Sequence, residues 1–214
     1  MVNKFEGLTS YHLKLLAAAT MVVDHVGVVF YPEDIWFRIV GRLSFPLFVW
    51  LLIQGEAHTK NVWQYGLRLA ALGVVSQPLY QAVLGANRPN ILFQLLLGLG
   101  CLRLARNFPR FTLPIWLGGA IVAWLTNVSY DAYGIALVAM TRHFQPTAAW
   151  WLVWAGFHGL WAWSAGPYQL PALPVPILFG LANGHRGPKA RWFYSFYPGH
   201  LALLWLSQHW LTQP

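Results

Sequence analysis

The segment YHLKLLAAATMVVDHVGVVFY, from Tyr11 to Tyr31, decides the fold of this chain. It is an apolar run of the length that a helix needs to cross a bilayer, about 20 residues. Asp24 and His25 lie inside it, with apolar residues on both sides. The segment therefore predicts a membrane-spanning helix that carries ionisable groups. We expect it to be retained rather than cleaved as a signal peptide.

The composition of the chain also indicates a membrane protein. Its 214 residues are 57% hydrophobic and only 9% charged, whereas a soluble domain has roughly 25% charged residues. Further apolar segments follow at 35–57, 62–84, 90–106, 111–127, 130–142, 147–164, 169–183 and 194–211. We predict an all-α, polytopic transmembrane helix bundle of about nine spans, forming one integral membrane domain over residues 1–214. The segments 130–142 and 169–183 are short, so either one fits a broken or re-entrant helix.

The net charge of +8 is spread over the gaps between the apolar segments. A nucleic-acid-binding protein gathers its basic residues on one face, so this distribution indicates membrane topology instead. With the N-terminus in the cytoplasm, the inner ends of the spans hold Lys4, Lys14, Lys60, Arg103, Arg106, Arg110, Arg142, Arg186, Lys189 and Arg191. Arg88 then lies outside, as does the C-terminus. The single cysteine, Cys101, excludes an intrachain disulfide and a cysteine-based zinc cluster.

Ionisable residues inside the first two spans are the candidates for function, because burying one at the bilayer centre costs ~2.5–3.5 kcal/mol. At ~1.5 Å per residue, His25 lies ~21 Å from the inner boundary and Arg42 ~12 Å from the outer one. Both positions fall in the same layer of a hydrocarbon core ~30 Å thick. A short turn joins the two spans, so we expect Asp24, His25 and Arg42 to meet.

This cluster has two interpretations. In the structural one, Asp24 and Arg42 form an ion pair that locks the two helices together. In the functional one, His25 is a general acid or base oriented by a carboxylate, and Arg38 and Arg42 bind an anion or a developing oxyanion. His200, in the last span, is a structural residue, a second acid–base group or the partner of His25 in a haem ligand pair.

Other polar residues have simpler interpretations. Asn90 and Gln94, one helical turn apart, either bridge helices or touch substrate. Glu56, at the inner end of segment 35–57, is typical of a solvated boundary, with access of a cytosolic substrate as the alternative. Tyr130, near a span end, is typical of the interfacial aromatic belt.

Several motifs together resemble the TraX family. They are MVVDHVG (Met21 to Gly27), GRLSFPLF (Gly41 to Phe48), GEAHT (Gly55 to Thr59), Tyr65 with Arg68-Leu69, NILFQ (Asn90 to Gln94), DAYG (Asp131 to Gly134) and FYSFYPGHL (Phe193 to Leu201). The resemblance runs over nearly the whole chain. That family is named for a conjugation protein that N-acetylates the amino terminus of pilin, and it is remotely similar to membrane acyltransferases that use cytosolic acyl-CoA.

The resemblance implies an acyltransferase, most simply an N- or O-acetyltransferase, in the bacterial inner (plasma) membrane. Asp24 and His25 become the catalytic pair, Arg42 their charge partner and His200 a second catalytic group. The substrate-binding residues would be Arg38, Arg68, Asn90, Gln94, Tyr133, Tyr194 and Tyr197.

The donor co-substrate would be acetyl-CoA or another acyl-CoA, docked by the basic inner ends, and no metal is expected. Besides membrane lipid, the expected partner is a pilin-like protein or glycan acceptor, and no nucleic acid. A proton-coupled transporter and a non-enzymatic assembly factor for surface appendages are the alternatives.

Overall fold

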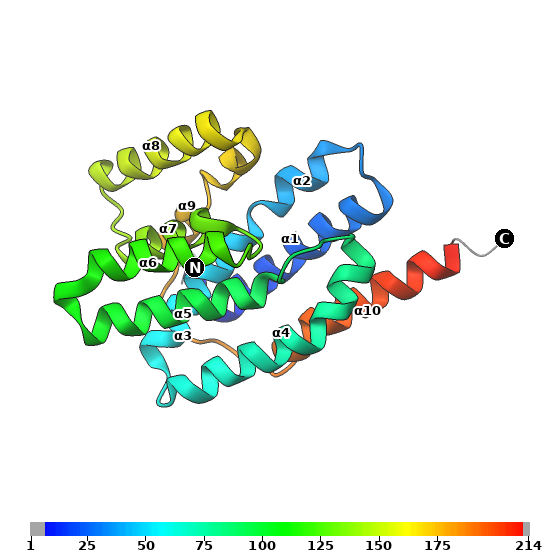
Figure 1. The fold of residues 1–214 in the computed structure, drawn as a ribbon, viewed down its shortest axis with the longest axis horizontal. Coiled ribbons are helices and arrows are strands. Elements are labelled where there is room, and N and C mark those ends of the chain that lie inside the picture. Colours follow the sequence, from blue (N-terminus) through cyan, green and yellow to red (C-terminus); the bar gives the residue numbers. More distant parts are fainter. Residues whose placement is uncertain (1–6, 212–214) are drawn as a thin grey trace, which may run out of the picture.

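The structure, a computed structural model, describes residues 7–211 and is all-α, as predicted. Lys4, counted above among the inner basic residues, lies outside the described residues. In chain order the α-helices are α1 (Ser10–Phe30), α2 (Ile35–Gly41), α3 (Ser44–His58), α4 (Val62–Leu84), α5 (Ile91–Asn107), α6 (Thr112–Leu125), α7 (Asp131–Arg142), α8 (Ala148–Ala165), α9 (Pro176–Gly180) and α10 (Phe193–Leu211). Two 3-10 helices, η1 (Pro109–Phe111) and η2 (Pro167–Ala172), lie between them (Figure 1).

The second apolar segment is broken into two helices. α2 ends at Gly41 and α3 begins at Ser44. Pro46 explains the break, because a proline has no backbone N–H for the carbonyl four residues earlier, that of Arg42, and its ring crowds that carbonyl. Prolines have the same effect in segment 169–183, which forms η2 and the short α9 instead of one helix.

Two helical segments among the described residues are long and apolar enough to cross a membrane, namely Ser10–Phe30 and Ile35–His58. The nine crossings expected from the sequence therefore stay a prediction. Large apolar side chains nevertheless cover much of the outer surface. Those more than half exposed include Leu67, Val74, Val75, Leu113, Leu117, Trp124, Leu152, Leu160, Trp163, Leu203 and Trp210.

The start of α1 lies beside the end of α9 and the start of α10. Leu8 donates its N–H to the carbonyl of Leu181 at 2.7 Å and pairs with Ala182. The ammonium of Lys14, early in α1, lies 5.4 Å from the ring centroid of Phe193, where α10 begins. α1 and α10 therefore start at the same end and run in the same direction (Figure 1). The last turn of α10 lies at the opposite end from the start of α1.

A continuous apolar core connects α1, α3, α5, α7 and α10. Leu13, Val49, Leu102, Leu137 and Leu201 are almost completely buried in it. α4 packs on α5 and α10, and α6 packs on α5 and α7. This core fixes α1, α3 and α10 around the residues that the sequence singled out.

Candidate active site

Two glycines allow α1 and α2 to approach closely around Asp24. A side chain on Gly27 would overlap Phe37, and one on Gly41 would overlap Asp24. Asp34 caps α2 by accepting a hydrogen bond from the N–H of Trp36 at 2.9 Å. The turn, the cap and the two glycines together place one face of α2 directly against Asp24.

Asp24 pairs with Arg38, whereas the sequence predicted Arg42. The Nη1 atom of Arg38 lies 2.9 Å from Oδ1 of Asp24. Gly41 faces Asp24, and Arg38, three residues earlier, shares that face of α2. Arg42 follows Gly41 directly and is turned about 100° away. It still interacts electrostatically with Asp24. The predicted residues therefore lie together, but Arg38 rather than Arg42 forms the ion pair with Asp24.

His25 is oriented by His200, whereas the sequence predicted a carboxylate. Its Nδ1 lies 2.8 Å from Nε2 of His200, and both side chains are buried. Nδ1 of His200 lies 2.9 Å from the carbonyl oxygen of Phe196. A carbonyl only accepts, so Nδ1 of His200 is the donor and, in neutral His200, Nε2 is the acceptor. His25 then donates from Nδ1, which leaves the lone pair on its Nε2.

This geometry does not support a haem between the two histidines. A metal ion needs its two nitrogen ligands ~4 Å apart, at ~2 Å per bond. The observed separation is 2.8 Å. Both nitrogens of His200 are also engaged in hydrogen bonds.

A cavity of about 220 Å³ opens beside these groups. Asp24, His25 and Arg38 line it together with Tyr197, which the sequence predicted as a substrate-binding residue. Its other polar lining residues are Ser44, Tyr80, Ser129 and Tyr130. A partly buried carboxylate, a guanidinium and an imidazole thus share one small chamber. Such a chamber can bind a small carbonyl group and transfer protons.

Tyr130 is a site residue that the sequence interpretation missed, since we assigned it to an interfacial belt. Its ring stacks on Phe45 at 3.8 Å between centroids. It lines the cavity together with Asp24 and Arg38. Its position next to the DAYG motif at Asp131 was the available signal.

Arg68 and Tyr194 lie together but outside this cavity. Nη1 of Arg68 is 3.5 Å from the Tyr194 hydroxyl, and its guanidinium lies 5.7 Å from the ring centroid. Tyr194 precedes His200 by six residues, which is ~9 Å along α10. The pair therefore lies toward the end of the bundle where α1 and α10 begin.

Asn90, Gln94 and Tyr133 are also outside the cavity lining. Asn90 caps α5 by accepting from the N–H of Leu92 at 3.0 Å and donates to the carbonyl of Gly73 in α4 at 2.8 Å. It therefore bridges helices, one of the two alternatives left open. Gln94 is fully buried, and its amide would overlap any side chain at Gly134.

Tyr133 contacts a buried histidine that the sequence analysis did not single out. Its hydroxyl donates to Nε2 of His158 at 3.2 Å, because Nδ1 of His158 is bonded to the Trp154 carbonyl at 3.0 Å. Both side chains are almost completely buried.

Glu56 is not at a solvated boundary, so that interpretation was wrong. Its side chain is only 1% exposed and lies 2.6 Å from Nη2 of Arg106 and 3.7 Å from Nη1 of Arg103. The carboxylate is buried because α3 packs against α5 at this level. Two arginines that the sequence assigned to acyl-CoA docking are thus engaged with it.

Comparison with known proteins extends the resemblance seen in the motifs. The family model described as TraX protein matches residues 10–208. The chain is also similar to a probable fimbrial assembly protein, FimC of serogroup H1, from Dichelobacter nodosus. The two share 28% identity over 229 residues, covering 92% of this chain and 94% of that protein. No solved structure matches the chain.

Proposed function

Because the chain belongs to the TraX family, we propose that it is an integral membrane acyltransferase. It moves an acyl group, most simply acetyl, from cytosolic acyl-CoA to an amine or hydroxyl of a pilin-like protein or surface glycan. The observation that carries this proposal is the hydrogen-bonded pair His25–His200, with His25 lining a small cavity beside Asp24 and Arg38. The name of the FimC relative, a fimbrial assembly protein, supports an acceptor related to surface appendages.

The arrangement of the helices supports a multi-pass topology in the bacterial inner membrane. The apolar side chains on the outside of α4, α6, α8 and α10 suit a lipid environment. α10 begins at the same end as α1 and runs parallel to it, as an odd number of crossings requires. Because the basic residues gather at the end where α1 begins, as in cytoplasmic loops, the N-terminus is then cytoplasmic and the last turn of α10 faces the other side.

His25 is the general base of the proposed reaction. The acceptor nitrogen or oxygen attacks the thioester carbonyl carbon and gives its proton to Nε2 of His25. The carbon–sulfur bond then breaks, and the proton passes from His25 to the leaving sulfur, which departs as CoA thiol. While His25 carries the charge, its Nδ1–H bond to His200 becomes charge-assisted and stronger.

Arg38 is the group best placed to stabilise the oxyanion of the tetrahedral intermediate. It lines the cavity and is held there by its ion pair with Asp24. Removing one such donor from an enzyme costs about 2.7–4 kcal/mol of transition-state stabilisation. Arg42, the partner expected from the resemblance, adds positive charge without lining the cavity.

The start of α10 supplies a docking site for the phosphates of acyl-CoA. Lys14 lies over Phe193, and Arg68 lies over Tyr194. Arg186 is close enough to Lys14 to interact with it electrostatically. Lys14 and Arg186 repel each other, and such like charges gain stability when a polyanion binds beside them. In the proposed orientation this cluster faces the cytoplasm, where acyl-CoA is found.

The test is transfer of radiolabelled acetyl from acetyl-CoA in membrane vesicles that contain the chain and a pilin-like protein or glycan extract. We expect covalent label on the acceptor with the unaltered chain. His25→Gln removes the base and should abolish labelling. His143→Gln, at an exposed histidine, is the matched control and should retain it. Label that crosses the membrane without covalent attachment would support the transporter alternative. Unchanged labelling in the His25 variant would overturn the assignment of the base.

A further inference from the structure

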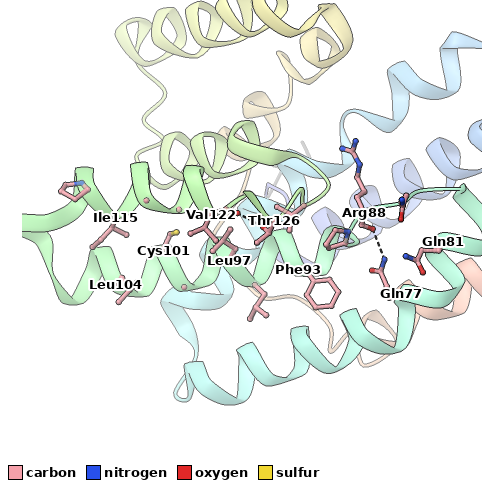
Figure 2. A pocket seen from close by; sticks show the side chains of 18 residues that line it. Gln77, Gln81, Arg88, Phe93, Leu97, Cys101, Leu104, Ile115, Val122 and Thr126 are labelled. Carbon is pink, nitrogen blue, oxygen red and sulfur yellow. Dashed lines mark hydrogen bonds between the residues drawn. The ribbon is translucent and has the colours of Figure 1, made fainter. Parts of the chain in front are cut away.

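A second, larger cavity lies on the outside of α4, α5 and α6. Its volume is about 1000 Å³, at the upper end of the range for small-molecule sites, roughly 300–1,000 Å³. Figure 2 shows Phe93, Leu97 and Leu104 of α5 lining it opposite Ile115 and Val122 of α6. We call it the α5–α6 groove.

Glycines form part of the floor of the α5–α6 groove. Gly100 of α5 and Gly118 of α6 both line it, and a side chain added at either would meet no atom within 4 Å. The space over these glycines is therefore open, whereas Gly119 beside them is filled by Cys101. A flexible hydrocarbon chain fits such a surface, since it needs apolar contact and no hydrogen-bonding partners.

Polar groups gather at one end of the groove. Gln77, Gln81 and Arg88 lie together there, away from Leu104 and Ile115 (Figure 2). Arg88 is the charged group among the described lining residues. Its backbone carbonyl accepts from Gln77 at 2.9 Å, and its Nη1 lies 3.5 Å from the carbonyl of Ser129. A guanidinium has five N–H donors, so most remain available to an anion.

The length of the groove matches one lipid acyl chain. Leu104 lies 11 positions after Phe93 in α5, or ~17 Å along the helix at ~1.5 Å per residue. One acyl chain fills about half of a hydrocarbon core ~30 Å thick, which is ~15 Å. Arg88 lies in the loop that precedes α5, so the charged end is at the outer membrane surface and the apolar groove extends from there along α5.

We propose that the α5–α6 groove binds one acyl chain of an anionic phospholipid, with the lipid phosphate at Arg88. The inference rests on the membrane location contained in the proposed function. In that orientation the lipid belongs to the outer leaflet. Its headgroup lies next to the reaction cavity, because Ser129, which contacts Arg88, also lines that cavity. The bound lipid thus forms part of the outer wall on the side where the acceptor arrives.

The experiment uses the full chain in phosphatidylcholine vesicles that contain a small fraction of photoactivatable phosphatidylglycerol. Photoactivatable phosphatidylcholine serves as the comparison lipid. After illumination, mass spectrometry of peptides locates the adducts. We expect adducts on α5 and α6 in the unaltered chain, more with phosphatidylglycerol than with phosphatidylcholine. Arg88→Gln should remove that preference and leave the labelling by phosphatidylcholine.

Gly118→Leu and Gly100→Leu fill the groove and should each lower the adducts on α5 and α6 severalfold. Gly156→Leu on α8, where an added side chain also meets no atom within 4 Å, is the matched control and should label normally. Two independent groove variants are used so that the test still holds if one of them does not fold. Thermal unfolding of each variant shows whether it is folded.

Three results would overturn the proposal: equal labelling by the two lipids, full labelling in both groove variants, or cross-links that join two copies of the chain through α5 and α6. His25→Gln should label with lipid as the unaltered chain does, because the groove does not use the base. Loss of acyl transfer with intact lipid labelling therefore separates failure of the proposed chemistry from failure of the groove assignment.

Discussion

Nδ1 of His25 and Nε2 of His200 lie 2.8 Å apart, although 175 residues separate them in the sequence. The contact fixes the proton arrangement of both rings, because the remaining nitrogen of His200 is bonded to a backbone carbonyl. His25 consequently keeps its Nε2 lone pair for a substrate. His200 acts through His25 and is a positioning residue in the proposed reaction.

Replacing His200 tests this positioning role. We expect His200→Phe to lower kcat for acetyl transfer by roughly 10–100-fold, the usual effect of losing a partner that orients a reacting group. His200→Gln should recover part of the rate, because its amide oxygen can accept from Nδ1 of His25. If the Gln and Phe variants are equally impaired while both remain folded, the orienting hydrogen bond is not the reason for the loss.

Arg38 and Arg42 should differ in their effect on transfer. Arg38→Gln removes the guanidinium that lines the cavity and should lower kcat by roughly 10²–10³-fold, as for an oxyanion donor. Arg42→Gln leaves that group in place and should have a clearly smaller effect. The measurement is kcat and KM with acetyl-CoA for both variants. A larger loss at Arg42 would restore the partner expected from the resemblance.

Gly41 should be intolerant of even one added carbon, because a Cβ there would overlap Asp24. We expect Gly41→Ala to destabilise the protein by ~1–3 kcal/mol, as overpacking does, and to impair transfer by displacing Asp24. Gly159→Ala on α8, with nothing within 4 Å of the added carbon, is the control. Thermal unfolding in detergent measures both, and equal melting temperatures would refute the close approach of α1 and α2.

Glu56 and its partners Arg103 and Arg106 should contribute unequally to stability. Arg106→Gln removes the closest partner of an almost completely buried carboxylate and should cost ~3–5 kcal/mol. Glu56→Gln should cost less, because both arginines are nearly half exposed and are hydrated when unpaired. The double variant should be more stable than Arg106→Gln alone. Additive losses in this cycle would mean that the two side chains do not interact.

The positions of the helices could be predicted from the sequence because they depend on local apolar runs and on proline. The predicted segments overlap α1, α4 to α8 and α10 closely. The segment 35–57 was predicted as one span and is divided between α2 and α3, and the chemistry of Pro46 accounts for that break. Local signals also brought Asp24, Arg38 and Arg42 to the turn between the first two spans, since few residues separate them.

Contacts between distant helices could not be predicted in the same way. Asp24 pairs with Arg38 rather than Arg42 because Gly41 packs against Asp24 in α1 and Arg38 lies on the same face of α2. The burial of Glu56 depends on α5, and the access of Tyr130 to the cavity depends on Phe45 in α3. Each of these results comes from packing partners that no local pattern specifies.

The order of the helices has a consequence for biosynthesis. The helix that carries His200 begins at Phe193 and is the last element of the described chain. A ribosome has therefore made the chain through α10 before the imidazole pair can form. A nascent chain, or one truncated before α10, lacks His200 and presents His25 without the partner that orients it. For the proposed reaction, this order means that acyl transfer cannot begin before α10 has been made.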